Sequence, residues 1–267
     1  MSEQRFGEWV AVRRHGDAGR VAELVLDRPK AMNAVSTDMA RGIAEACAAL
    51  AADRSVSVAV LSSTHERAFC VGADLKERNS FSDADLMKQR PHTRAAYTAV
   101  LELPMPSVAA VHGFALGGGY ELALACDVIV ADPTAVVGLP EVSVGVIPGG
   151  GGTQLLPRRV GAARAAQLIF TGRRVPAAEA LGLGLIDVLA EEGQDGTEAL
   201  ALAARMARNS PVGLWAAKRA LRLGQGTDLR TGLDVEDAAW RTVAFSGDRA
   251  EGVAAFNEKR DPVWPGE

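Results

Sequence analysis

Two glutamates, Glu121 and Glu141, lie twenty residues apart, and each stands beside a glycine-rich turn in an apolar stretch of the chain. A reaction that moves protons at two neighbouring carbon atoms needs one group that removes a proton and another that delivers one. A partly dry pocket can separate the pKa values of two carboxylates, so that one serves as base and the other as acid. A single glutamate is more often a solvated side chain, so the neighbouring residues decide the interpretation.

The segment that leads into Glu121 favours a catalytic role. Residues 108–111 predict a buried strand, and residues 120–126 predict a helix that is apolar except for Glu121 and its ends. Gly117, Gly118 and Gly119 then form the strand-to-helix turn, where the free N–H groups of the first helical turn can bind an anion. The helix macrodipole favours an ionised Glu121, which suits a base. The alternative is a tight packing turn, for which one glycine more often suffices than three.

A second segment of small residues could supply another backbone donor. Gly72, Ala73 and Asp74 come shortly after a strand predicted over residues 56–61. An oxyanion hole needs two N–H groups that converge on one oxygen, each worth about a hundred- to thousandfold in rate. Taken alone, this composition is common in turns and favours a solvent-exposed loop.

These segments belong to a wider pattern, because the chain resembles the enoyl-CoA hydratase/isomerase family of the crotonase superfamily over almost its whole length. The matching stretches are residues 26–34, 69–76, 112–123, 126–127, 140–141 and 147–158. The resemblance implies an α/β fold with a crotonase-like ββα spiral core over residues 1–195, which holds an acyl-CoA site. It also implies that the C-terminal helical region, residues 196–267, serves oligomerisation as a homotrimer or a dimer of trimers.

The resemblance also implies roles for individual residues. The backbone N–H groups of Ala73 and Gly118 would bind the thioester oxygen, and Glu121 and Glu141 would form the catalytic pair. Other residues are implied to bind the coenzyme A thioester: Arg28, Lys30, Ala31, Asp74, Leu75, Lys76, Gly117, Trp240 and Lys259. Without the resemblance, the last two would be interpreted as a core tryptophan and a solvated lysine.

Because glutamate stands at both acidic positions, reversible hydration of a 2-enoyl-CoA thioester to a 3-hydroxyacyl-CoA fits best. Glu121 would take a proton from the attacking water, and Glu141 would deliver one to the α-carbon. The alternatives are double-bond isomerisation, dehydration of a specialised acyl-CoA, or a non-catalytic acyl-CoA-binding or RNA-binding relative. A non-catalytic relative should have lost a catalytic carboxylate or gained a basic face, and this sequence shows neither.

Composition excludes several other functions. The 267 residues are 48% hydrophobic, and 29 basic against 33 acidic residues give a net charge of −4 without a basic stripe, so no nucleic-acid partner is expected. The first six residues lack an apolar core and no apolar run approaches ~18 residues, which predicts a cytoplasmic protein without membrane segments. Cys47, Cys70 and Cys126 lie in apolar contexts and predict reduced core thiols.

No cofactor is expected beyond the coenzyme A that the substrate carries. The sequence contains no Walker A loop, no G-x-G-x-x-G fingerprint and no G-x-S-x-G elbow. The four histidines have no metal-ligand spacing, so no metal site is predicted. His112, at the end of an apolar strand, is expected to satisfy a local hydrogen bond.

The remaining pattern predicts an α/β half followed by an almost wholly helical half. Further elements are a strand at residues 21–26 and a helix at 37–51. Residues 80–94, polar and mixed in charge, predict a solvated helix rather than a mobile lid. After Gly161 the predicted helices are 162–171, 176–181, 197–208, 211–223, 228–245 and 248–259, with a short strand near 187–189.

Overall fold

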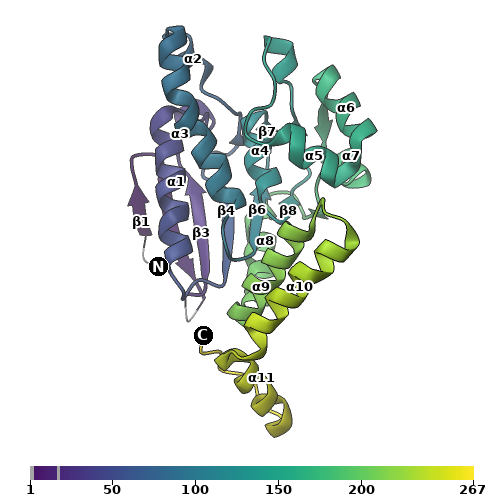
Figure 1. The fold of residues 1–267 in the computed structure, drawn as a ribbon. Helices are drawn as coiled ribbons and strands as arrows, with labels where there is room; N and C mark the ends of the chain where they lie inside the picture. Colours follow the sequence, from purple (N-terminus) through teal and green to yellow (C-terminus); the bar gives the residue numbers. More distant parts are fainter. Residues whose placement is uncertain (1–2, 17–18) are drawn as a thin grey trace.

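Two β-sheets enclosed by helices make up the computed structural model of the chain, which describes residues 3–16 and 19–267 (Figure 1). Met1 and Ser2, part of the N-terminal segment considered above, lie outside the described residues. In the described residues the larger sheet has the order β1-β2-β3-β4-β6-β8-β11. Its strands are β1 (Glu3–Phe6), β2 (Val10–His15), β3 (Val21–Leu26), β4 (Val58–Ser63), β6 (Ser107–Val111), β8 (Val128–Ala131) and β11 (Val188–Leu189). The first three pair antiparallel, and β3 onwards pair parallel.

The parallel part of the larger sheet is buried on both faces, as alternation along β4 shows. Val58 and Val60 join a core cluster with α8 (Asp195–Ala207), whereas Ala59 and Leu61 face the main cluster that includes α1 (Thr37–Ala52). Helix coverage on both faces is typical of parallel sheets. The side chain of Ser36 caps α1 by accepting the N–H of Met39, and α3 (Asp83–Leu101) packs beside α1 (Figure 1).

The smaller sheet begins where the chain leaves the larger one. Its order is β10-β9-β7-β5, with β5 (Ala68–Cys70), β7 (Phe114–Leu116), β9 (Val136–Gly138) and β10 (Arg174–Pro176). Only His112 and Gly113 separate β6 from β7, and β7 leads directly into α4 (Gly118–Ala125). The predicted α/β core is therefore confirmed, and the glycine turn before α4 lies at the end of a strand.

His112 makes the hydrogen bonds expected of it. Its Nδ1 lies 2.9 Å from Asp195 Oδ2 and its Nε2 lies 2.6 Å from the carbonyl oxygen of His65. The hydrogen bond to Asp195 raises the pKa of His112 despite its burial. The imidazole thus links the end of β6 to the start of α8, and its role is structural.

Short helical elements connect the sheets and carry several predicted site residues. They are η1 (Pro29–Ala31), α2 (Leu75–Arg78), η2 (Glu141–Val144), α5 (Gly152–Val160), α6 (Ala162–Thr171) and α7 (Ala177–Leu183). Helix α3 starts with a capping box between Ser82 and Asp85 and continues beyond the predicted residue 94 to Leu101. It is not wholly solvated, because Thr93, Ala96 and Tyr97 are buried.

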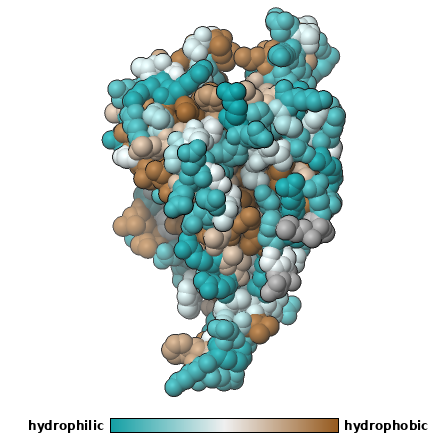
Figure 2. Space-filling model, turned by 180° about the vertical axis from the view of Figure 1, so that it is seen from behind, coloured by the Kyte–Doolittle hydropathy of each residue, from teal (hydrophilic) through white to brown (hydrophobic). Residues whose placement is uncertain are grey.

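The C-terminal region consists of α9 (Pro211–Gly224), α10 (Leu229–Ala244) and α11 (Gly247–Glu258). Asp127 anchors α9 to the core through Lys218 Nζ at 2.8 Å and Arg222 Nη2 at 2.7 Å. Helix α10 buries none of its residues, and hydrophobic side chains are exposed at several places on the rear face of the molecule (Figure 2). Helix α8 begins at Asp195 and packs on the larger sheet. The division of the chain into two regions at residue 195 stays a prediction.

All three cysteines are free and buried, as expected of core thiols. Burial raises the pKa of each thiol to about 12, so none is a ready nucleophile. None of the helices in the described part of the chain combines the length and apolar character that crossing a membrane requires.

Candidate active site

The turn before α4 requires glycine at three successive positions, each for its own reason. Gly117 has a φ of 53°, a conformation that favours glycine. A Cβ on Gly118 would lie 2.1 Å from the hydroxyl oxygen of Tyr97, and one on Gly119 would lie 1.9 Å from the carbonyl oxygen of Cys70. Gly118 and Gly119 fit the alternative of packing glycines, whereas Gly117 is required for its backbone conformation, so packing alone does not explain the turn.

Glu121 projects from the first turns of α4 into a cradle of backbone donors. The residue is 2% exposed, and its Oε1 accepts hydrogen bonds from the N–H groups of Gly150 and Gly152, both at 2.7 Å. Burial raises the pKa of Glu121, and the two N–H groups act in the opposite direction. Since these donors stabilise the carboxylate, Glu121 has the environment of a base.

Glu141 is the first residue of η2, and its side chain lies against the glycine turn before α4. A Cβ on Gly117 would lie 3.1 Å from Glu141 Oε1. Its Oε2 is buried and has no hydrogen-bond partner among the described residues. Burial, together with the nearby charge of Glu121, raises the pKa of Glu141 to about 7. The two carboxylates therefore share one site while their environments differ, which is the condition for dividing base from acid.

The segment around Ala73 packs against the glycine turn. Gly72 has a φ of 90°, and a Cβ there would lie 3.0 Å from the amide nitrogen of Gly118. Val35 donates to the carbonyl of Gly72 and accepts from the N–H of Asp74, which leaves the N–H of Ala73 between these bonds. The N–H groups of Ala73 and Gly118 have no acceptor among the described residues. Two unpaired N–H donors in adjoining segments can form an oxyanion hole.

Arg28 and Asp74 form a clamp that supports Ala73. Arg28 Nη1 donates to Asp74 Oδ2 at 2.7 Å and to the carbonyl of Ala34 at 2.8 Å. Asp74 also caps α2 by accepting the N–H groups of Lys76 and Glu77. Burial acts to raise the pKa of Asp74, but these donors hold it below its usual value. Both side chains are engaged by the protein, and their predicted substrate contacts stay predictions.

The other predicted binding residues fall into two groups. Lys30 and Ala31 lie in η1. Leu75 and Lys76 begin α2 after its N-cap residue Asp74, and both are exposed. Trp240 lies on the exposed α10, and Lys259 follows α11, which is at the opposite end of the molecule from α2 (Figure 1). A single copy of the chain therefore brings together the glycine turn, Ala73 and both glutamates, but not Lys259.

Three residues at this site were not found from the sequence. Gly150 and Gly152 hold Glu121, and the only sequence signal was a glycine run before a helix. Tyr97 lies against Gly118, but it falls beyond the solvated helix that the sequence predicts over residues 80–94. No local pattern connects these residues to Glu121.

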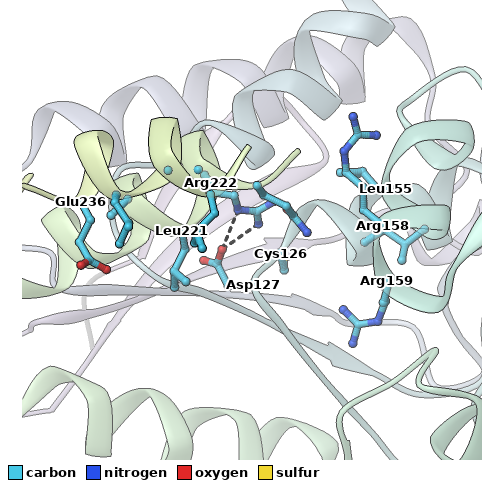
Figure 3. A pocket seen from close by; sticks show the side chains of 15 residues that line it. Cys126, Asp127, Leu155, Arg158, Arg159, Leu221, Arg222 and Glu236 are labelled. Carbon is cyan, nitrogen blue, oxygen red and sulfur yellow. Dashed lines mark hydrogen bonds and ion pairs between the residues drawn. The ribbon is translucent and has the colours of Figure 1, made fainter. Parts of the chain in front are cut away.

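A separate cavity of about 590 Å³ lies between α4 and α5 on one side and α9 and α10 on the other (Figure 3). Its lining includes Asp127, Arg158 and Arg222, but neither Glu121 nor Glu141. Asp127 forms an ion pair with Arg222, so this cavity lies at the contact between the core and the C-terminal helices. Within residues 3–16 and 19–267, no cluster of three or more His, Cys, Asp or Glu side chains could hold a metal ion.

Known proteins share both the sequence and the fold of this chain. The family model described as enoyl-CoA hydratase/isomerase matches residues 16–267. Human mitochondrial methylglutaconyl-CoA hydratase is 39% identical over 271 residues, which cover 100% of this chain and 80% of that protein. Enoyl-CoA hydratase domain-containing protein 2 of Bos taurus is 41% identical over 251 residues, covering 92% and 85%. The crystal structure of an enoyl-CoA hydratase from Bacillus anthracis superposes with a TM-score of 0.93 at 37% identity, covering 97% and 100%.

Proposed function

The chain belongs to the enoyl-CoA hydratase/isomerase family of the crotonase superfamily, and we propose that it reversibly hydrates a 2-enoyl-CoA thioester to a 3-hydroxyacyl-CoA. One observation carries this proposal: two glutamates with different environments meet at the turn that also presents an unpaired N–H group. Hydration needs a base for water, an acid for the α-carbon and donors for the thioester oxygen.

Each component has a defined task in the proposed reaction. The N–H groups of Ala73 and Gly118 bind the thioester oxygen and stabilise the negative charge that grows there as water attacks the β-carbon. Ionised Glu121 removes a proton from that water. Protonated Glu141 delivers a proton to the α-carbon, which completes the addition of one molecule of water. The proton taken up by Glu121 must then return to Glu141, directly or through solvent, before the next turnover. The chain supplies base, acid and oxyanion donors, and we therefore propose that no metal or nucleotide cofactor takes part.

The rate should follow a bell-shaped curve with pH. Glu141 must be protonated, and because its pKa is about 7, kcat/KM should fall as the pH rises through about 7. Glu121 must be ionised, so kcat/KM should also fall at acid pH, below the raised pKa of that group. The measurement is kcat/KM for the best substrate between pH 4 and about 9. A profile that stays flat on the alkaline side would contradict the assignment of Glu141 as the acid.

A substrate series tests the reaction type and narrows the acyl group. We expect protein dialysed against a chelator to hydrate straight-chain 2-enoyl-CoA thioesters or 3-methylglutaconyl-CoA, the latter included because one relative is named for that hydration. The same protein is given 3-enoyl-CoA thioesters to detect isomerisation. Isomerisation without any water addition would favour the alternative reaction of the family.

We also propose that the chain forms oligomers through its C-terminal helices. Support comes from α10, which buries no residue, and from large apolar side chains exposed on it, including Leu229, Leu233 and Trp240. Exposed apolar surface of this kind often marks a protein interface. A trimer or a dimer of trimers and a cytoplasmic location stay predictions.

A further inference from the structure

Tyr97 carries a hydroxyl group that lies at the candidate site and has no hydrogen-bond partner among the described residues. The residue is 7% exposed, and its hydroxyl oxygen, Oη, is bonded to no other described residue. The chain has two tyrosines, and the other one, Tyr120, donates from its hydroxyl to the carbonyl of Leu185 at 2.8 Å. A hydroxyl that a mostly buried ring holds at a reaction centre, and that has no protein acceptor, is free to donate to a bound group.

The surroundings fix where this hydroxyl lies. The Tyr97 ring covers Gly150, because a Cβ there would lie 2.6 Å from the ring's Cγ. Its oxygen lies against Gly118, since a Cβ on that residue would be 2.1 Å from Oη and 3.5 Å from Gly72 Cα. The oxygen is therefore near the point where the segments that carry the N–H groups of Gly118 and Ala73 meet.

Charge and burial keep this group a donor. Burial raises the pKa of Tyr97 well above its usual value, and the negative charges of Glu121 and Glu141 act in the same direction, while Arg78 opposes them. Tyr97 thus stays protonated at any pH at which the glutamates work. Neither carboxylate accepts its proton in the structure, and Glu121 Oε1 is already bonded to two backbone N–H groups.

We propose that the Tyr97 hydroxyl is a third hydrogen-bond donor to the thioester oxygen, beside the N–H groups of Ala73 and Gly118. The inference rests on the proposed function. The hydrogen bond from a neutral, rigidly held phenol becomes stronger as negative charge grows on the thioester oxygen. It therefore stabilises the transition state more than the bound substrate. Its loss should then lower kcat and leave KM nearly unchanged.

Tyr97→Phe removes the hydroxyl and keeps the ring on Gly150. We expect kcat to fall by about a hundredfold, the lower end of the effect of removing one oxyanion-hole donor, with KM changed by less than about twofold. The thermal midpoint should not fall, because no protein hydrogen bond is lost.

Polarisation of the thioester carbonyl is measured separately, by difference infrared spectroscopy of bound butanoyl-CoA labelled with carbon-13 at its carbonyl. This saturated thioester cannot be hydrated, and its carbonyl stretch should be shifted less from the free value in Tyr97→Phe than in wild type.

Tyr120→Phe is the matched control, because it removes a hydroxyl that bonds to Leu185 outside the turn. The carbonyl band of butanoyl-CoA bound to Tyr120→Phe should stay at the wild-type position. In this background 3-fluorotyrosine labels Tyr97 alone, and the more acidic phenol should shift the band further than wild type does. This arm decides the question if Tyr97→Phe fails to fold.

The outcomes separate the two proposals. An active wild type whose carbonyl band is unchanged both by Tyr97→Phe and by fluorination would overturn the third donor and leave the proposed hydration intact. A lower rate with an unchanged band would overturn it as well, since the hydroxyl would then act elsewhere. A wild-type protein that neither shifts the butanoyl-CoA band nor hydrates any 2-enoyl-CoA would overturn the proposed function itself.

Discussion

Glu141→Gln and Glu121→Gln are each expected to slow hydration by about a hundred- to ten-thousandfold, because a positioned acid or base contributes that much. Glutamine at 141 cannot deliver the proton that the α-carbon requires. Glutamine at 121 can still accept the N–H groups of Gly150 and Gly152 through its carbonyl oxygen, so the cradle should persist. The loss should therefore appear in kcat, with KM and the thermal midpoint close to wild type.

Glu45→Gln provides the matched control, because Glu45 is exposed on α1 and touches neither the turn nor the other glutamates. It should keep wild-type turnover. Steady-state kinetics on the best substrate and thermal unfolding are measured for all three variants. If Glu121→Gln or Glu141→Gln retains more than about a tenth of wild-type turnover, the assignment of two catalytic glutamates is wrong.

Gly118→Ala should lower turnover by about a hundredfold or more, because it disturbs a backbone donor of the oxyanion hole. The new Cβ would lie 2.1 Å from Tyr97 Oη, so the turn or the Tyr97 side chain must move. Stability should fall as well. In Gly118→Ala/Tyr97→Phe the nearest clashing atom is gone, and we expect the thermal midpoint to recover while turnover stays low.

Gly182→Ala is the control for this series. Gly182 lies in α7, its φ is not positive, and a Cβ there meets nothing within 4 Å. Kinetics and thermal unfolding of the two single variants and the double variant are compared. Equal, mild effects of Gly118→Ala and Gly182→Ala on turnover would mean that the turn does not activate the thioester.

The sequence revealed the parts of the site that local patterns encode. Glu121 follows a strand, a glycine turn and the start of a helix within a single segment, and each of these has its own signature. The donors that hold Glu121 come from Gly150 and Gly152, which reach it only after the chain has formed β8, β9 and η2. Such contacts depend on tertiary structure and leave no local periodicity.

The position of Tyr97 at the site also depends on tertiary structure that the sequence pattern does not reveal. Its helix α3 begins with polar residues, and the pattern therefore favoured a solvated helix, although the second half buries one face against α1 and α4. Similarly, β5, β7, β9 and β10 have three residues each, too few for an alternating pattern. Strand β3 and helix α6 have the predicted bounds, whereas β4 begins two residues later than predicted.

The most direct test of the proposed hydration is the fate of labelled water. Purified protein is incubated with 2-butenoyl-CoA in deuterium oxide enriched in oxygen-18, and the thioester products are analysed by mass spectrometry. The proposed mechanism predicts 3-hydroxybutanoyl-CoA with oxygen-18 on the β-carbon and one deuterium on the α-carbon, and much less of it with Glu141→Gln. Recovery of an isomerised thioester without oxygen-18, or of free coenzyme A with labelled carboxylic acid, would contradict it.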